Sequence, residues 1–189
     1  MNYWPDNTIY FLTTSTFLHF PYFREYGQKS IVLTQLIKAQ KRFNLSSLVY
    51  SIAINHYHVK FHLRYGGELA KIKQLINGGI SYEYRRRFNS RYSEMWQSSR
   101  TIRVISEAMD WKVTGYIIGN LLKHKEVSTF NELKEDPFSS FKEIAEQCGE
   151  ERARQLVYSV IEANEDSRGS LSIHSLEKLK VSDTPTEVG

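Results

Sequence analysis

The sequence is poor in the features that mark secreted and membrane proteins. It contains one cysteine, Cys148, in 189 residues, which excludes a disulfide within the chain and fits a reducing cytosol. No apolar run approaches the ~20 residues that a membrane-spanning helix needs. The N-terminus has no basic segment followed by a long apolar stretch, so we expect no signal peptide. We therefore expect a cytoplasmic protein.

Aromatic residues are abundant, with 12 Tyr and 10 Phe, and the charge is unevenly distributed. Residues 1–125 hold 18 Lys and Arg against 7 Asp and Glu, a balance of +11, whereas residues 126–189 hold 7 against 14, a balance of −7. A basic front half favours a polyanionic partner. Exposed aromatics beside arginines suit stacking on unpaired bases, although a Tyr-rich sheet accounts for at least half of them.

Apolar periodicity predicts a mixed α+β core. Strands are expected at residues 9–17, 45–54, 56–64 and 101–105, and helices at 29–43, 68–88 and 111–125. We predict that Ser30 and Asp110 cap the starts of the first and third helices and that Asn44 ends the first. Gly78-Gly79 is expected to bend or stop the second helix. The element order favours a ferredoxin-like βαββαβ core with an antiparallel sheet, followed by an additional third helix.

The composition divides the chain into three parts: a basic domain over 1–125 that suits a polyanionic partner, an acidic helical extension over 126–165, and a polar, partly disordered tail over 166–189. Within the extension, Asp136-Pro137 marks a turn, and helices are expected at 141–148 and 150–162 on either side of Gly149. We expect these helices to cap the core, with dimerisation or DNA binding as alternatives.

Two histidines in the expected third strand provide a candidate metal site. His56 and His58 stand one residue apart in Asn55-His56-Tyr57-His58, so their side chains project from the same face roughly 6–7 Å apart. That separation lets two imidazoles converge on one cation. A surface or purely structural role is the more common one for such a pair taken alone. His62 shares the face but lies about 20 Å from His56 along the strand, too far to bind the same ion.

The expected third helix carries Tyr116 and Asn120. Residues four apart lie on one helix face, so a nucleophile and an oxygen ligand would point together toward the histidine strand. Gly115 and Gly119 lie beside them and are expected to let the helix approach the sheet closely. A tyrosine in an amphipathic helix is more often a core-edge residue than a catalytic one.

Together these motifs resemble the HUH single-tyrosine transposases, an IS200-like family. The resemblance covers roughly residues 8–140 and rests on Asn55-His56-Tyr57-His58 and on Tyr116-Ile117-Ile118-Gly119-Asn120. A third stretch, Asp136-Pro137-Phe138-Ser139-Ser140, is similar to Trp-Pro-Trp-Ser-Ser of the REP-associated tyrosine transposase branch. The sequence departs from that pattern with Tyr57 between the histidines, Leu121 after Asn120, and Ala53-Ile54 before the first motif.

The resemblance implies Tyr116 as the catalytic nucleophile and His56, His58 and Asn120 as metal ligands, with Mg²⁺ or Mn²⁺ as cofactor. It implies cleavage and strand transfer of single-stranded or hairpin DNA through a 5′-phosphotyrosine intermediate. In the resembled family, short members exchange the tyrosine helix between two subunits, whereas the REP-associated branch can act as a monomer, so both a homodimer and a monomer fit.

Basic side chains provide candidate contacts to the DNA backbone. A run at the end of the second expected helix stands out, and simple solvation explains it equally well. The candidates are Lys60, Lys71, Lys73, Arg85, Arg86, Arg87, Arg91, Arg100 and Arg103.

Two other functions stay open. A non-catalytic or domesticated single-stranded nucleic-acid-binding module also fits a ferredoxin-like sheet with exposed aromatics. A metal-dependent phosphodiester hydrolase that uses the two histidines without covalent tyrosine chemistry is the second.

Overall fold

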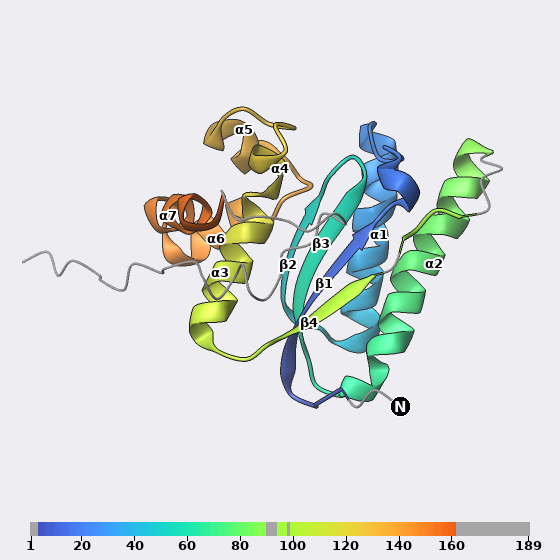
Figure 1. The fold of residues 1–189 in the computed structure, drawn as a ribbon, viewed down its shortest axis with the longest axis horizontal. Helices are drawn as coiled ribbons and strands as arrows, with labels where there is room; N and C mark the ends of the chain where they lie inside the picture. Colours follow the sequence, from blue (N-terminus) through green and yellow to red (C-terminus); the bar gives the residue numbers. More distant parts are fainter. Residues whose placement is uncertain (1–3, 90–93, 98, 162–189) are drawn as a thin grey trace, which may run out of the picture.

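The computed structural model describes residues 4–89, 94–97 and 99–161. Four strands form one antiparallel sheet with the order β2-β3-β1-β4: β1 (Thr8–Ser15), β2 (Ser46–Ile52), β3 (His56–Leu63) and β4 (Arg100–Val104) (Figure 1). Helix α1 (Tyr26–Phe43) connects β1 to β2, and α2 (Leu69–Phe88) connects β3 to β4. This order and connectivity define the predicted ferredoxin-like βαββαβ core.

The two faces of β3 serve different layers. Tyr57, Val59 and Phe61 are fully buried and face α1 and α2, since the Tyr57 hydroxyl donates a hydrogen bond to Asn77 Oδ1 of α2 at 2.5 Å. Side chains alternate along a strand, so His56 and His58 project to the opposite face of the sheet.

A second helical layer covers that opposite face (Figure 1). It consists of α3 (Glu107–Ile118), α4 (Asn120–Lys123), α5 (Phe130–Glu135), α6 (Phe141–Cys148) and α7 (Glu150–Val160). One hydrophobic core runs from the sheet into α3, α6 and α7. The acidic extension is therefore packed onto the layer that carries Tyr116.

Two predicted helix caps are wrong. Helix α1 starts at Tyr26, where Glu25 and Gln28 form a capping box, and Ser30 instead donates to the Tyr26 carbonyl oxygen at 2.8 Å. Helix α3 starts earlier than predicted because the Ser106 hydroxyl accepts a hydrogen bond from the Met109 N–H. The predicted end of α1 is confirmed, since Asn44 adopts a left-handed conformation with φ 48°.

Helix α2 runs unbroken through Gly78-Gly79, contrary to the expected bend or stop. A methyl group on Gly79 would lie 2.5 Å from Gln35 Oε1 of α1. The absence of a side chain therefore lets two long helices cross closely, and their packing offsets the low helix propensity of glycine.

Some sequence predictions fall on residues outside the described ranges. These are Arg91, residues 162–165 at the end of the predicted extension, and the tail over 166–189. Helix α5 was not predicted, and short 3₁₀ helices also occur at η1 (Phe17–His19) and η2 (Gly66–Glu68). None of the described helices combines the length and the low polarity that crossing a bilayer requires.

Candidate active site

Strand β3 holds the two histidines at the centre of the sheet, between β1 and β2. The side chain of His56 is 4% exposed and that of His58 is fully buried. Their ring centroids lie 4.9 Å apart. The predicted convergence of the two imidazoles on one point of the sheet surface is therefore present.

Neighbouring polar groups orient both rings through their Nδ1 atoms. His56 Nδ1 lies 2.7 Å from Asn55 Oδ1, and His58 Nδ1 lies 2.9 Å from Thr13 Oγ1 of β1. Contacts of this kind fix the tautomer and direction of an imidazole that uses its other nitrogen for a ligand. Both rings are thus held with their Nε2 atoms directed toward the second helical layer.

Helices α3 and α4 bring the remaining predicted residues to the same place. Gly119 between them keeps helical backbone angles, so the stacking expected for residues four apart continues across the junction. The Tyr116 ring lies 5.0 Å from the His58 ring. Asn120 Oδ1 lies 3.0 Å from His56 Nε2. All four predicted site residues form one cluster within one chain.

The structure adds His124, which is not among the predicted site residues. Its ring lies 4.8 Å from that of His56. Its spacing of four from Asn120 was the available signal, because Tyr116, Asn120 and His124 follow one helix face. Thr13 had no comparable signal, since its place beside His58 comes from the pairing of β1 with β3.

The donor set at the cluster fits a divalent cation with open coordination positions. The cluster would offer such a cation two imidazole nitrogens and one amide oxygen, from His56, His58 and Asn120. Over the described residues, no group of three or more His, Cys, Asp or Glu side chains is arranged as a metal site. The arrangement therefore differs from a closed structural zinc site, in which four protein ligands surround the metal.

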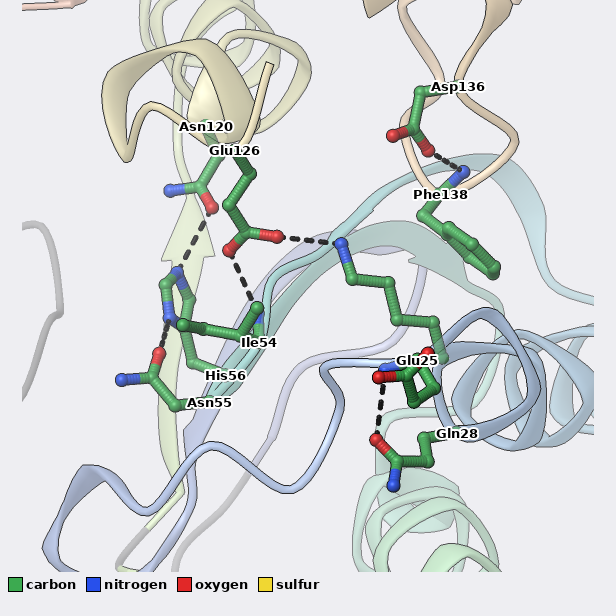
Figure 2. Close-up of polar contacts among 10 residues, drawn as sticks. Glu25, Gln28, Ile54, Asn55, His56, Asn120, Glu126, Asp136 and Phe138 are labelled. Atoms are coloured by element: carbon green, nitrogen blue, oxygen red, sulfur yellow. Dashed lines mark hydrogen bonds and ion pairs between the residues drawn. The ribbon is translucent and has the colours of Figure 1, made fainter.

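Glu126 clamps the segment after α4 onto the histidine hairpin (Figure 2). Its carboxylate accepts a hydrogen bond from the Ile54 backbone N–H at 2.8 Å and pairs with Lys29 Nζ of α1 at 2.6 Å. The Lys29 and Glu126 side chains are only 8% and 12% exposed. These contacts hold the backbone on either side of the contact between His56 and Asn120.

Lys60 lies on the histidine face but is turned toward α3. Its Nζ contacts Asp110 Oδ1 at 2.5 Å and Thr114 Oγ1 at 2.6 Å, and its side chain is 5% exposed. Burial lowers the pKa of Lys60, and the hydrogen bond to Asp110 opposes that shift. Asp110, predicted as a helix cap, is instead the partner of this buried ammonium group.

Arg100 is the candidate DNA-contacting arginine that shares a sheet row with the site. Thr13 pairs with His58 on one side and with Arg100 on the other, so these three side chains project from one face of the sheet. Arg103 pairs with Tyr10 and belongs to the opposite face. The two arginines of β4 thus point into different layers.

The other described basic candidates lie along α2. Arg85, Arg86 and Arg87 are exposed at its C-terminal end, and Glu83 Oε2 lies 2.7 Å from Arg86 and 3.4 Å from Arg87. In Figure 1 this end of α2 lies at the same end of the molecule as the hairpin between β2 and β3. Lys71 and Lys73 belong to the first turns of α2, at the other end.

Gly115 and Gly119 face α7 and not the sheet, contrary to the sequence prediction. A methyl group on Gly115 would lie 2.4 Å from the Leu156 carbonyl oxygen, and one on Gly119 would lie 2.6 Å from Val157 Cγ1. The two glycines let α7 pack closely against the side of the helix that lies next to Tyr116.

A comparison with solved structures finds a protein of the same fold. A structure of a REP-associated tyrosine transposase bound to a REP hairpin matches with a TM-score of 0.57, covering 92% of this chain and 97% of that chain. The two sequences are 16% identical, so the likeness shows the fold. No protein-family model matches the chain, and no curated protein matches it in sequence.

Proposed function

We propose that this protein cleaves and rejoins single-stranded DNA as a tyrosine transposase, with Tyr116 as the nucleophile. The observation that supports this most strongly is the meeting of His56, His58, Tyr116 and Asn120 within one chain. The solved structure of the same fold is that of a transposase with a hairpin bound. The basic balance of residues 1–125 suits a polyanionic substrate.

In the first step, the phenolic oxygen of Tyr116 attacks a phosphodiester phosphorus and the bond from phosphorus to the 3′-oxygen breaks. The phenolic proton is lost, the 3′-oxygen takes up a proton, and the 5′-phosphate is left esterified to Tyr116. Attack by a 3′-hydroxyl of another end reverses the chemistry and rejoins the strand. Lys123 places its ammonium group 5.2 Å from the centre of the Tyr116 ring.

His56, His58 and Asn120 would hold Mg²⁺ or Mn²⁺. When bound, such a cation neutralises phosphate charge and stabilises the leaving 3′-oxygen. Asn55 and Thr13 keep the imidazoles in the orientation that this binding requires. Arg100, on the same sheet row, would contact a phosphate of the bound strand.

Substrate access requires a movement, because the Tyr116 side chain is 2% exposed. The segment from Leu121 to Glu126 closes the site through the contacts of His124 with His56 and of Glu126 with Ile54 and Lys29. We infer that DNA binding opens this segment, with α3 and Asn120 retained at the histidines. The contacts of Glu126 with Ile54 and Lys29 then determine how readily DNA reaches the Tyr116 hydroxyl.

The test is to incubate the protein with labelled single-stranded DNA containing hairpins, in Mg²⁺ or Mn²⁺, and to separate the products on a denaturing gel. We expect a covalent protein–DNA adduct that disappears in Tyr116→Phe. Tyr57→Phe is the matched control, because Tyr57 is equally buried but faces the opposite layer, and it should still form the adduct.

The same gel separates the alternatives. Cleavage without an adduct that survives Tyr116→Phe would identify a hydrolase that uses the histidines alone. Binding without cleavage across a hairpin library would identify a binding module. Either result would overturn the tyrosine mechanism.

A further inference from the structure

The turn that follows β1 exposes three apolar side chains beside the histidine hairpin. Phe17 is 40% exposed, Leu18 is 74% exposed and Phe20 is 47% exposed. Clustered large apolar side chains at a protein surface usually mark a binding surface. We call Phe17, Leu18 and Phe20 the apolar turn.

The backbone of this turn is strained. Leu18 and His19 both adopt positive φ values, 52° and 53°, a region that bulky L-residues rarely enter. Strain of this kind persists only where the surroundings enforce it, and it concentrates at functional sites. Here it holds the side chain of Leu18 outward, at the tip of the turn.

Hydrogen bonds tie the turn to the residue next to His56. The hydroxyl of buried Thr16 shares its one hydrogen between the carbonyl oxygens of Phe20 and Asn55, at 2.7 and 2.9 Å. The Asn55 side-chain amide donates to the His19 carbonyl oxygen at 3.3 Å, while Asn55 Oδ1 contacts the His56 ring. The apolar turn and the histidine ring are therefore held in one frame.

Positive side chains lie on the two other sides of the same hairpin. Phe23, whose N–H donates to the Ile54 carbonyl oxygen, is followed by exposed Arg24. Across the hairpin, exposed His124 contacts the His56 ring and is followed by exposed Lys125. Flat apolar groups flanked by cations match a strand whose bases are unpaired and whose backbone is anionic.

Resting on the proposed function, we propose that the apolar turn is a stacking platform for unpaired bases of the DNA next to the phosphate that Tyr116 attacks. Phe17 and Phe20 supply aromatic faces, and Leu18 inserts beside a base. Stacking of this kind contributes affinity without fixing a base sequence.

The test compares two probes with equal backbone charge: an oligothymidylate of about 20 nucleotides and an abasic strand of the same length. Wild-type protein should bind the base-containing strand at least about tenfold more tightly. The double substitution Phe17→Ala with Phe20→Ala should remove this preference and leave binding of the abasic strand unchanged. Tyr65→Ala, an exposed aromatic after the far end of β3, should keep the preference.

Each contrary outcome has a distinct meaning. Equal binding of both probes by wild type, or an unchanged preference in the double variant, overturns the platform and leaves the proposed function standing. Binding of neither probe overturns both. A dimer that the double substitution converts to monomer would make the turn a contact between two copies and overturn the platform. The backbone strain at residue 18 is measured separately. Leu18→Gly should melt at or above the wild-type temperature, because glycine adopts this φ without strain.

Discussion

Glu126 is the residue on which the closed form of the site depends most visibly (Figure 2). Its ion pair with Lys29 is largely removed from water, and the carboxylate also satisfies the Ile54 N–H. Removing one member of a buried pair costs more than the pair itself contributes, because the remaining charge stays buried.

We therefore expect Glu126→Gln to lower the free energy of unfolding by about 3 kcal/mol, measured by denaturant titration. The corresponding drop in melting temperature is about 6–12 °C for a chain of this size. Glu135→Gln, at an exposed glutamate of α5, is the control and should change little. Equal, small effects of both substitutions would contradict the clamp.

On the other side of the sheet, buried Tyr57 makes the stability of the protein depend on pH. Burial raises the pKa of Tyr57 above its ordinary value of 10.0, so above pH 10 the unfolded chain releases this proton while the folded chain retains it. Stability is full below pH 10 and falls as the pH rises. Between pH 10 and 11 we expect wild type to lose about 1 kcal/mol more than Tyr57→Phe, as followed by urea unfolding at each pH. Parallel losses in the two proteins would refute this assignment.

At the scale of elements, the contact between α3 and α7 determines how firmly the helix that carries Tyr116 is held in place. Gly115 leaves no room for a methyl group against Leu156, whereas Gly78 on α2 has nothing within 4 Å of the same position. Gly115→Ala should therefore destabilise the protein by about 1–3 kcal/mol through overpacking. Gly78→Ala should stabilise it by about 0.5–1 kcal/mol. Thermal unfolding of the two variants provides the comparison, and a stabilised Gly115→Ala would show that α7 does not pack as described.

Elements were predictable where local patterns decide them. Alternation around His56 and helical spacing through α1, α2 and α6 come from neighbouring residues, so their existence and order could be predicted. The N-caps were not, because Ser30 and Asp110 also suit an N-cap, whereas the helices begin after Glu25 and Ser106, where the capping contacts form. The direction faced by Gly115 also depends on α7, which is distant in sequence.

The candidate site was predictable as a set of residues more than as an environment. Spacing alone puts His56 beside His58 and Tyr116 beside Asn120. The contacts of His58 with Thr13 and of Glu126 with Lys29 depend on strand register and on tertiary packing. No local pattern encodes those two contacts.

At the scale of the whole molecule, the candidate DNA-contacting residues of α2 separate into two ends. Fifteen residues of helix place Arg86 about 22 Å from Lys71, more than two Debye lengths at physiological salt. Substituting Arg85, Arg86 and Arg87 together with alanine should weaken binding of single-stranded DNA and lower its salt slope by up to about 2. Lys71→Ala with Lys73→Ala should leave both unchanged. Fluorescence anisotropy over a salt series measures this, and an equal loss from the lysine pair would place the DNA elsewhere.

The central claim is that one phenol, held beside two imidazoles, becomes joined to DNA. The most direct measurement is mass spectrometry of peptides from protein trapped with single-stranded hairpin DNA and digested with nuclease and protease. We predict a nucleotide adduct on the peptide that contains Tyr116, absent in Tyr116→Phe. Adducts on another tyrosine, or DNA cleaved while every tyrosine stays unmodified, would contradict the account.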